Sequence, residues 1–203
     1  MLTLVLASAS PRRRELLAQA GFTFTVHPAH IPEDPFPNED PIACVTRLAR
    51  EKAEAVFREI TKAPASDQRA AAALQVLAAD TIVTLDNQIL GKPSDTADAA
   101  RMLRLLSGRT HQVITSVALI TTTSTQVAAE TTAVTFLPLT EDDIAAYIAT
   151  GEPMDKAGAY AIQGRAARWI PRIDGDYFNV VGLPLALVSS LLDSARSSVA
   201  STS

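Results

Sequence analysis

The sequence predicts a mixed α/β fold in which helices pack on one β-sheet. Strand-like runs rich in apolar residues, Thr or Val alternate with helix-like segments bounded by Ser, Thr, Asp, Pro and Gly, and this order is typical of helices packed on a sheet. The chain has 203 residues, of which 47% are hydrophobic and 20% charged, an ordinary globular balance. That length is enough for one substantial core or two small lobes. We therefore expect one compact unit that folds by itself.

The first strand and helix are defined by composition and by capping signals. Residues 2–7 are nearly all apolar, which indicates a short strand buried on both faces of a sheet. Ser10 is a favourable N-cap and Pro11 suits the first helical position, where a missing N–H has no consequence. Gly21 is a plausible stop for this helix. The sequence thus predicts a strand that leads through a tight turn into a helix.

A second helix is expected over about residues 40–60, opened by Asp-Pro in the same way. The connection between the two helices, residues 28–37, is rich in Pro and contains Glu33 and Asp34. Residues 62–75 are rich in Ala and weakly patterned, so we expect a variable connection without chemical function.

The remaining elements follow from the same kinds of signal. Strands are expected over 76–85 and 88–90, joined by a turn at Asp86-Asn87, and a helix over 96–106. A Thr- and Val-rich hairpin follows over about 111–123 and 126–137, and then a helix from Thr140 to Gly151 with Asp143 in a capping box. The last elements are a loop over 152–164, a strand near 168–173 and a helix opened by Pro184. We expect residues 1–195 to form a single domain and the small, polar residues 196–203 to form a frayed tail.

Composition excludes several classes of protein. The net charge of −4 argues against a binder of nucleic acid polymers. One cysteine, Cys44, excludes an internal disulfide, and the three histidines show no zinc-site spacing. No apolar run approaches the roughly 18 residues of a membrane span, and the N-terminal run lacks the basic residues of a signal peptide. We therefore expect a cytoplasmic protein with no membrane partner.

Three consecutive arginines, residues 12–14, stand at the predicted start of the first helix, where the helix dipole disfavours cations. An anion would remove this conflict, because free N–H groups at the helix start, the hydroxyls of Ser8 and Ser10, and the forked donors of arginine all bind phosphate. Successive helical residues fan out by about 100°, so Arg12 and Arg13 are the ones expected to reach one ligand. The alternative is that the arginines are solvated surface charges.

Two further charged residues lie where apolar side chains are expected. Lys52 falls on the apolar stripe of the second helix, so it either contacts a ligand or extends its charge past the edge of the stripe. Asp80 lies within an otherwise apolar or Thr-containing run, where a carboxylate needs a metal ion, a cation or a position at the strand end. Lys92 could return to the same region through the turn at Asp86-Asn87. With Glu33, these residues point to metal-assisted phosphorus chemistry, and no glycine-rich phosphate loop motif is present.

Seven blocks of the sequence, in their order along nearly the whole chain, resemble the Maf family of nucleoside triphosphate pyrophosphatases. They are LASASPRRRELL, CVTRLAREKA, AADTIV, ILGKP, MLRLLSGRTHQV, GEPMDKAGAYAIQG and IDGDYFNVVGLPL. The resemblance implies an elongated, two-lobed Maf/ITPase-like fold, a mixed sheet with flanking helices and a central cleft. It also implies hydrolysis of a nucleoside triphosphate to the monophosphate and pyrophosphate with Mg²⁺ or Mn²⁺.

The resemblance also implies roles for individual residues. Catalytic roles fall to Asp80, as the base that deprotonates water, and to Lys52 and Lys92. Substrate binding falls to Ser8, Ser10, Arg12, Arg13, Thr81 and Gln163, and metal binding to Glu33 and Asp80. Arg12, Thr81 and Gln163 stand at positions that accompany a preference for dTTP and UTP, and the amide of Gln163 could match the edge of a pyrimidine.

Two other functions remain open at this stage. One is a pyrophosphatase for 7-methyl-GTP or another non-canonical purine triphosphate. The other is a non-catalytic nucleotide-binding regulator of septum formation, because the family is also associated with arrest of cell division. The resemblance further implies a homodimer.

Overall fold

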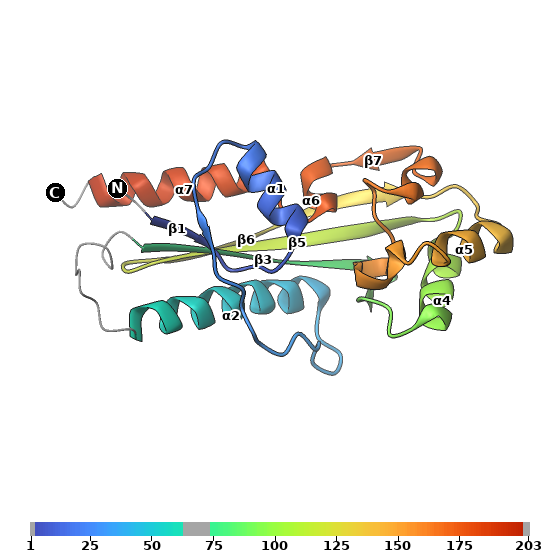
Figure 1. The fold of residues 1–203 in the computed structure, drawn as a ribbon, viewed down its shortest axis with the longest axis horizontal. Coiled ribbons are helices and arrows are strands. Elements are labelled where there is room, and N and C mark those ends of the chain that lie inside the picture. The colour runs from blue at the N-terminus through green and yellow to red at the C-terminus, as the bar shows by residue number, and fades with distance from the viewer. Residues whose placement is uncertain (1–2, 63–73, 201–203) are drawn as a thin grey trace. The chain divides into compact units, whose positions relative to one another are not determined.

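The structure, a computed structural model, describes residues 3–62 and 74–200 (Figure 1). Most of the variable connection predicted over 62–75 lies outside the described residues, which include only its two ends. Lys62 is the last residue of a helix and Leu74 the first of a strand. Residues 201–203, the end of the predicted tail, also lie outside.

The described strands form one mixed sheet, as the sequence predicted. Its order is β2-β1-β3-β5-β6-β7, and β4 also pairs with β3. The first three strands of this order run parallel, whereas β3 with β4 and β6 with β7 are antiparallel pairs. The strands are β1 (Thr3–Leu6), β2 (Thr25–Val26), β3 (Leu74–Leu85), β4 (Gln88–Leu90), β5 (Thr110–Thr121), β6 (Thr125–Thr135) and β7 (Arg172–Asp174).

The α-helices are α1 (Pro11–Gln19), α2 (Pro41–Lys62), α4 (Thr96–Leu106), α5 (Glu141–Ile148), α6 (Tyr177–Val181) and α7 (Leu185–Ala200), and the 3₁₀ helices are η1 (Glu152–Asp155), η2 (Ala157–Ala159) and η3 (Arg165–Trp169). The first four α-helices begin and end close to the positions that the capping signals predicted. The capping box of Thr140 and Asp143 is present in full. No helix in the described ranges is long and apolar enough to span a bilayer.

Several elements differ from the sequence prediction, including the 3₁₀ helices η1 and η2 within the predicted loop over 152–164. The short strand β2 and the single-turn helix α6 were not predicted, because each is too short to carry a periodic pattern. The strand expected over 168–173 is replaced by η3 followed by the short strand β7, so Arg168 is in a 3₁₀ helix. Helix α7 continues through residues 196–200, which the sequence assigned to a tail.

The chain divides into two compact units. Unit 1 comprises Met1–Asp80, Thr115–Glu130 and Gly182–Ser203, and unit 2 comprises Thr81–Ile114 and Thr131–Val181. The long strands β3, β5 and β6 each contribute residues to both units.

Unit 1 packs helices on both faces of its strands. Figure 1 shows α2 on one face and α1 and α7 on the other. The core beneath α2 consists of side chains from α2, β1, β3 and β5, namely Val5, Ala7, Ala49, Ala53, Val56, Leu74, Val76, Ala78, Ala118 and Ile120. Five of these are alanines, which lets α2 approach the sheet closely. This close approach places the polar side chains of α2 within reach of β3.

Unit 2 has its own core, which includes an aromatic group beneath helices α4 and α5. The rings of His111, Phe136 and Tyr160 meet edge to face with centroids 4.8–5.4 Å apart. Tyr147 and Trp169 form a second edge-to-face pair, at 5.4 Å. These rings fix β5 and β6 against the 3₁₀ segments that follow α5.

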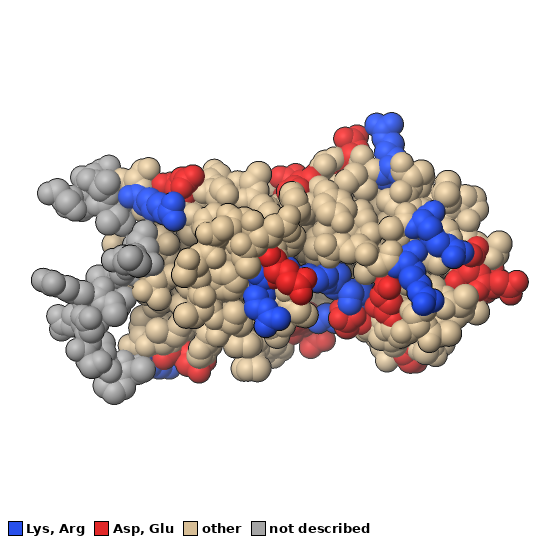
Figure 2. All heavy atoms as spheres, turned by 45° about the horizontal axis from the view of Figure 1, so that its top comes forward, with Lys and Arg blue, Asp and Glu red and all other residues tan. Residues whose placement is uncertain are grey.

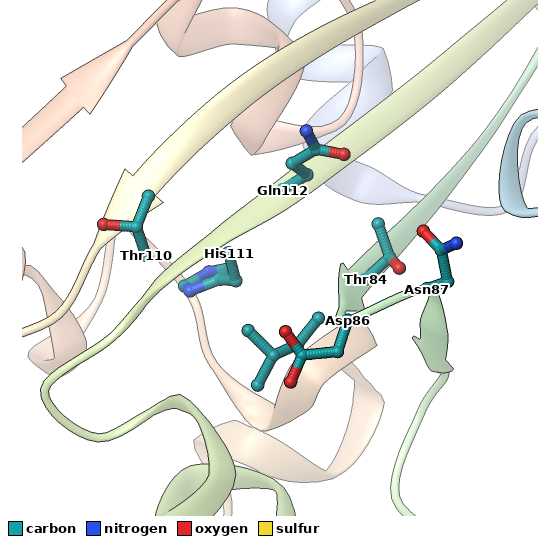
Figure 3. A pocket seen from close by; sticks show the side chains of 7 residues that line it. Thr84, Asp86, Asn87, Thr110, His111 and Gln112 are labelled. Carbon is teal, nitrogen blue, oxygen red and sulfur yellow. The ribbon is translucent and has the colours of Figure 1, made fainter.

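A polar pocket in unit 2 lies beside this aromatic group (Figure 3). It has a volume of about 220 Å³ and is lined by Thr84, Leu85, Asp86, Asn87, Thr110, His111 and Gln112, none of which the sequence assigned to a site. His111 Nε2 lies 2.8 Å from the Tyr160 hydroxyl oxygen. His111 Nδ1 and Thr84 Oγ1 are buried and have no hydrogen-bond partner among the described residues.

Gly158 of unit 2 should tolerate substitution poorly. Its φ is +68°, and an added Cβ would lie 2.9 Å from Val83 Cγ2. We expect Gly158→Ala to lower the free energy of unfolding by about 2–4 kcal/mol, which combines backbone strain with overpacking. Gly21→Ala isolates the strain, because Gly21 has φ +81° and nothing within 4 Å of an added Cβ. Urea unfolding checks both, and equal losses in the two variants would contradict the contact with Val83.

His111 should make the stability of the protein depend on pH. Burial lowers the pKa of His111 to about 4, from an ordinary 6.5. As the pH falls from about 6.5 to 4, the unfolded chain binds a proton that the native state does not, so the free energy of unfolding falls by up to about 3 kcal/mol. We expect His111→Gln to remove this slope in urea titrations between pH 4 and 7. The same substitution at the exposed His30 is the control, and a slope that persists in His111→Gln would contradict the assignment.

Candidate active site

The charges on the surface of the protein are largely paired with one another. On the face drawn in Figure 2, Lys and Arg side chains lie beside Asp and Glu side chains. Arg104 with Glu141 and Arg109 with Asp86 are two such exposed pairs, each with an N···O distance of 2.7 Å. Pairs of this kind contribute little to stability, because water screens both charges.

A different arrangement surrounds Lys52, whose side chain is only 7% exposed. Lys52 Nζ lies 2.5 Å from Asp80 Oδ1 and 2.8 Å from Glu33 Oε1. The Asp80 side chain is 9% exposed and that of Glu33 46%. The ammonium therefore joins one buried and one accessible carboxylate. All three residues were predicted site residues, and the structure brings them together within unit 1.

The positions of Lys52 and Asp80 follow from the elements that carry them. Lys52 lies on the buried side of α2, as its spacing predicted, and its charge ends at two carboxylates instead of extending past the stripe to solvent. Asp80 is in the interior of β3, so the alternative of a strand-end carboxylate is wrong. Asp80 is compensated by a cation, one of the possibilities that the sequence left open.

The start of α1 forms a second polar region of unit 1. Ser10 is the N-cap, and its hydroxyl accepts a hydrogen bond from Arg13 N at 3.5 Å. Ser8 is buried, and its hydroxyl accepts from Ser10 N at 3.2 Å and from Arg13 Nη1 at 3.4 Å. The two serines, predicted as phosphate ligands, therefore also shape the turn between β1 and α1.

The arginines of α1 divide into different environments, as the 100° rotation per residue predicted. Arg13 donates to backbone carbonyls, from Nη1 to Ala79 O at 2.7 Å and from Nε to Gly182 O at 2.8 Å. Burial lowers the pKa of the Arg13 guanidinium, the charges of Asp80 and Glu33 oppose this shift, and Arg12 adds to it. Arg12 is half-buried and Arg14 is exposed. Arg13 thus ties α1 to the residue that precedes Asp80.

Three predicted site residues, Thr81, Lys92 and Gln163, belong to unit 2. Thr81 follows Asp80 in β3, and successive side chains of a strand point to opposite faces of the sheet. Lys92 is exposed and follows β4, which runs back along β3 by pairing Leu90 with Val83, as the predicted turn required. Gln163 is exposed in the segment between η2 and η3.

Glu152, which the sequence analysis did not single out, holds the segment that carries Gln163. Its carboxylate accepts hydrogen bonds from the Tyr147 hydroxyl at 2.7 Å and from Arg165 N at 3.1 Å. A Cβ on Gly164 would overlap Glu152 Oε1. Glu152 is part of the GEPMDKAGAYAIQG block, but its role depends on a contact that the order of residues does not reveal.

The donors at Lys52 fit a divalent cation that is held partly by substrate. Among residues 3–62 and 74–200, no three His, Cys, Asp or Glu side chains gather to hold a metal by themselves. Two carboxylates, Glu33 and Asp80, nevertheless converge on one ammonium group. Mg²⁺ commonly takes one or two carboxylates and completes its shell with phosphate oxygens and water. The set is therefore suited to an ion that arrives with a phosphorylated ligand.

Known proteins resemble this chain over nearly its full length. A dTTP/UTP pyrophosphatase of Koribacter versatilis is 52% identical over 189 residues, covering 93% of this chain and 92% of the relative. A dTTP/UTP pyrophosphatase of Moorella thermoacetica is 53% identical over 194 residues, covering 95% and 94%. The Ham1 protein of Staphylococcus aureus has a similar fold, with a TM-score of 0.50 at 15% identity over 95% of this chain and 99% of that one. Residues 3–195 match the family described as Maf-like protein, and the chain belongs to that family.

Proposed function

We propose that this protein is a nucleoside triphosphate pyrophosphatase that hydrolyses dTTP and UTP to the monophosphate and pyrophosphate. The observation that carries the proposal is the buried ammonium of Lys52 between Glu33 and Asp80. This arrangement supplies a base, a cation and carboxylates for a divalent ion within one site. The relatives that are about 50% identical over most of the chain are named dTTP/UTP pyrophosphatases, which supports the same activity and base preference here.

The triphosphate is proposed to bind at the start of α1 and at Lys52. Unpaired N–H groups at a helix start and the helix dipole favour a phosphate there. Arg12 and Arg13 add cationic donors, and Ser8 and Ser10 add hydroxyls. Arg13 is held by the carbonyls of Ala79 and Gly182, so its guanidinium is in place before substrate arrives. Such preorganised donors stabilise charge that develops in a transition state.

Asp80 is proposed to activate the attacking water. Its carboxylate accepts a proton from water as the water oxygen bonds to the α phosphorus, and the bond from that phosphorus to the bridging oxygen breaks. Pyrophosphate then leaves with the electron pair of that bond. Lys52 and Lys92 are proposed to stabilise the negative charge on the phosphates during this step. The position of Asp80 inside a buried strand suits this role, because a fixed base loses little freedom on reaction.

Glu33 and Asp80 are proposed to hold the divalent cation, Mg²⁺ or Mn²⁺, together with phosphate oxygens. When bound, such an ion neutralises phosphate charge and orients the triphosphate. The carboxylate of Glu33 is accessible, so it can give up its contact with the Lys52 ammonium and bind the metal ion when substrate arrives.

Arg12, Thr81 and Gln163 are proposed to select the base. The amide of Gln163 offers both a donor and an acceptor, as the edge of a pyrimidine does. Its segment is held by Glu152, which keeps the amide from being displaced freely. We further propose a cytoplasmic enzyme that acts as a homodimer.

A substrate panel tests the proposal. We expect pyrophosphate release with Mg²⁺ or Mn²⁺ to be fastest with dTTP and UTP among the common triphosphates and 7-methyl-GTP. Asp80→Asn should lower kcat by about 10²-fold or more, because it removes the base. The variant should still fold, because Lys52 keeps Glu33 as a partner. Asp86→Asn is the matched control, since Asp86 is 72% exposed and paired only at the surface with Arg109.

Each other outcome of the panel has a definite meaning. Undiminished turnover by Asp80→Asn would remove Asp80 from the mechanism. Preference for 7-methyl-GTP or another purine would overturn the base assignment alone. Nucleotide binding without pyrophosphate release from any substrate would indicate a non-catalytic regulator, the role linked with septum formation, instead of an enzyme.

Gln163→Ala should alter base preference more than rate. Loss of one or two hydrogen bonds to the base is expected to lower kcat/KM for dTTP and UTP by about 5- to 20-fold, with a smaller effect on CTP. Competition between paired substrates measures this ratio directly. Gln19→Ala, at an exposed glutamine on α1, is the control. A uniform loss with every nucleotide would contradict a base-reading role.

A further inference from the structure

We propose that Arg47 is a positioning residue of this site, which fixes residues 34–39 and thereby presents Glu33 to Lys52 and to the divalent cation. The inference rests on the proposed function, in which Glu33 is a metal ligand. Arg47 lies on α2 and was not among the residues that the sequence assigned to the site. Its contacts reach the loop that carries Glu33 from three directions.

The guanidinium of Arg47 binds both side chains and backbone of this loop. Nε donates to Glu39 Oε1 and Nη2 to Glu39 Oε2, both at 2.7 Å, which is the forked geometry of a strong Arg–carboxylate pair. Nη2 also donates to Asp34 O at 3.2 Å. The Phe36 ring lies 3.9 Å from the guanidinium carbon, within the range of a cation–π contact. One side chain therefore contacts the first, middle and last residues of 34–39.

Besides the Arg47 contacts, the loop is held by the fixed φ of its prolines and by the ion pair of Glu33 with Lys52. No helix or strand includes residues 28–40, and Phe36 is 59% exposed, so its ring has little apolar packing. Within the loop, Glu39 Oε2 accepts from Phe36 N at 2.9 Å, which closes a turn around the carboxylate that Arg47 binds. Glu33 directly precedes the carbonyl that Arg47 holds. The Arg47 contacts therefore help to set the direction in which the Glu33 side chain points.

The pair of Arg47 and Glu39 is sheltered and remains charged under assay conditions. Their side chains are 15% and 11% exposed, less than in the surface pairs described above. The Arg47 hydrogen bonds are the main cause that lowers the pKa of Glu39 to about 2. Glu51, on the same helix, accepts from Arg47 Nη1 at 3.2 Å and orients the guanidinium further.

Helix α2 links this contact to the catalytic charges. Arg47 and Lys52 are five residues apart on one helix, a rise of about 7.5 Å. The helix that fixes the loop therefore also carries the ammonium to which Glu33 is bonded. A change at Arg47 is expected to move Glu33 relative to Lys52 without changing either residue.

The test compares Arg47→Met and Glu39→Gln with wild type in two measurements. The first is Mn²⁺ affinity, from the electron paramagnetic resonance of free Mn²⁺ with a non-hydrolysable α,β-imido analogue of dUTP. The second is hydrogen exchange of the backbone amides of Asp34, Phe36, Asn38 and Glu39, since residues 35 and 37 are prolines. We expect Mn²⁺ affinity to fall about 5- to 20-fold and these amides to exchange faster, while the melting temperature changes by a few degrees. Arg47→Lys should not restore the affinity, because lysine lacks the forked donors.

Two further variants separate the possible outcomes. Arg104→Met removes an exposed forked pair with Glu141, at 2.8 and 2.7 Å, and should leave both measurements unchanged. Glu33→Gln should lower Mn²⁺ affinity by itself. If Glu33→Gln has no effect, the metal assignment fails, and the inference with it. If Glu33→Gln weakens Mn²⁺ binding but Glu39→Gln and Arg47→Met do not, the positioning role alone is overturned.

Discussion

The site depends on the ammonium group of Lys52, which is buried and therefore cannot be solvated by water. A buried charge is strongly unfavourable unless it is paired and hydrogen-bonded, and Lys52 meets this requirement only because β3 and the Pro-rich loop each bring a carboxylate to it. Removal of one partner from such a pair leaves the other uncompensated. The constraint therefore couples three segments that are far apart in the sequence. Helix α2 supplies the cation, and the alanines beneath it permit the close approach to β3.

The cations around this site have two different roles. Arg13 and Arg47 hold parts of the fold together, whereas Lys52 binds the carboxylates of the proposed active site. Arg13 binds backbone carbonyls and so ties α1 to β3 and to the residue that begins the last segment of unit 1. Arg47 binds a carboxylate, a carbonyl and a ring, all in one loop. Lys52 binds the carboxylates of Asp80, the proposed base, and of Glu33, a proposed metal ligand. The three consecutive arginines that conflict with the helix dipole are thus explained in part by contacts within the protein, which offset the unfavourable position of Arg13.

Local signals in the sequence predicted those parts of the fold that depend on neighbouring residues. The helix over 96–106 and the capping box at Thr140 were predicted correctly because caps and periodicity are local properties. The buried position of Lys52 followed from the same periodicity. The contact between Glu33 and Lys52 was not predicted, since it depends on the path of a loop; the residue types indicated only that Glu33, Lys52 and Asp80 serve one phosphate site. The Arg47 contacts were missed for the same reason, although the residue lies within a recognised block.

The close contact between the Glu152 carboxylate and Gly164 limits which substitutions the two positions can accept during evolution. A side chain at position 164 would overlap the Glu152 carboxylate and force it to move away from Arg165 N and the Tyr147 hydroxyl. The effect of a substitution at 164 thus depends on the residue at 152, and the reverse also holds. Such mutual dependence is epistasis, and it makes both positions resistant to gradual drift. Divergence of base preference in this lineage is therefore expected to proceed through exposed positions such as Gln163, with the backbone beneath them unchanged.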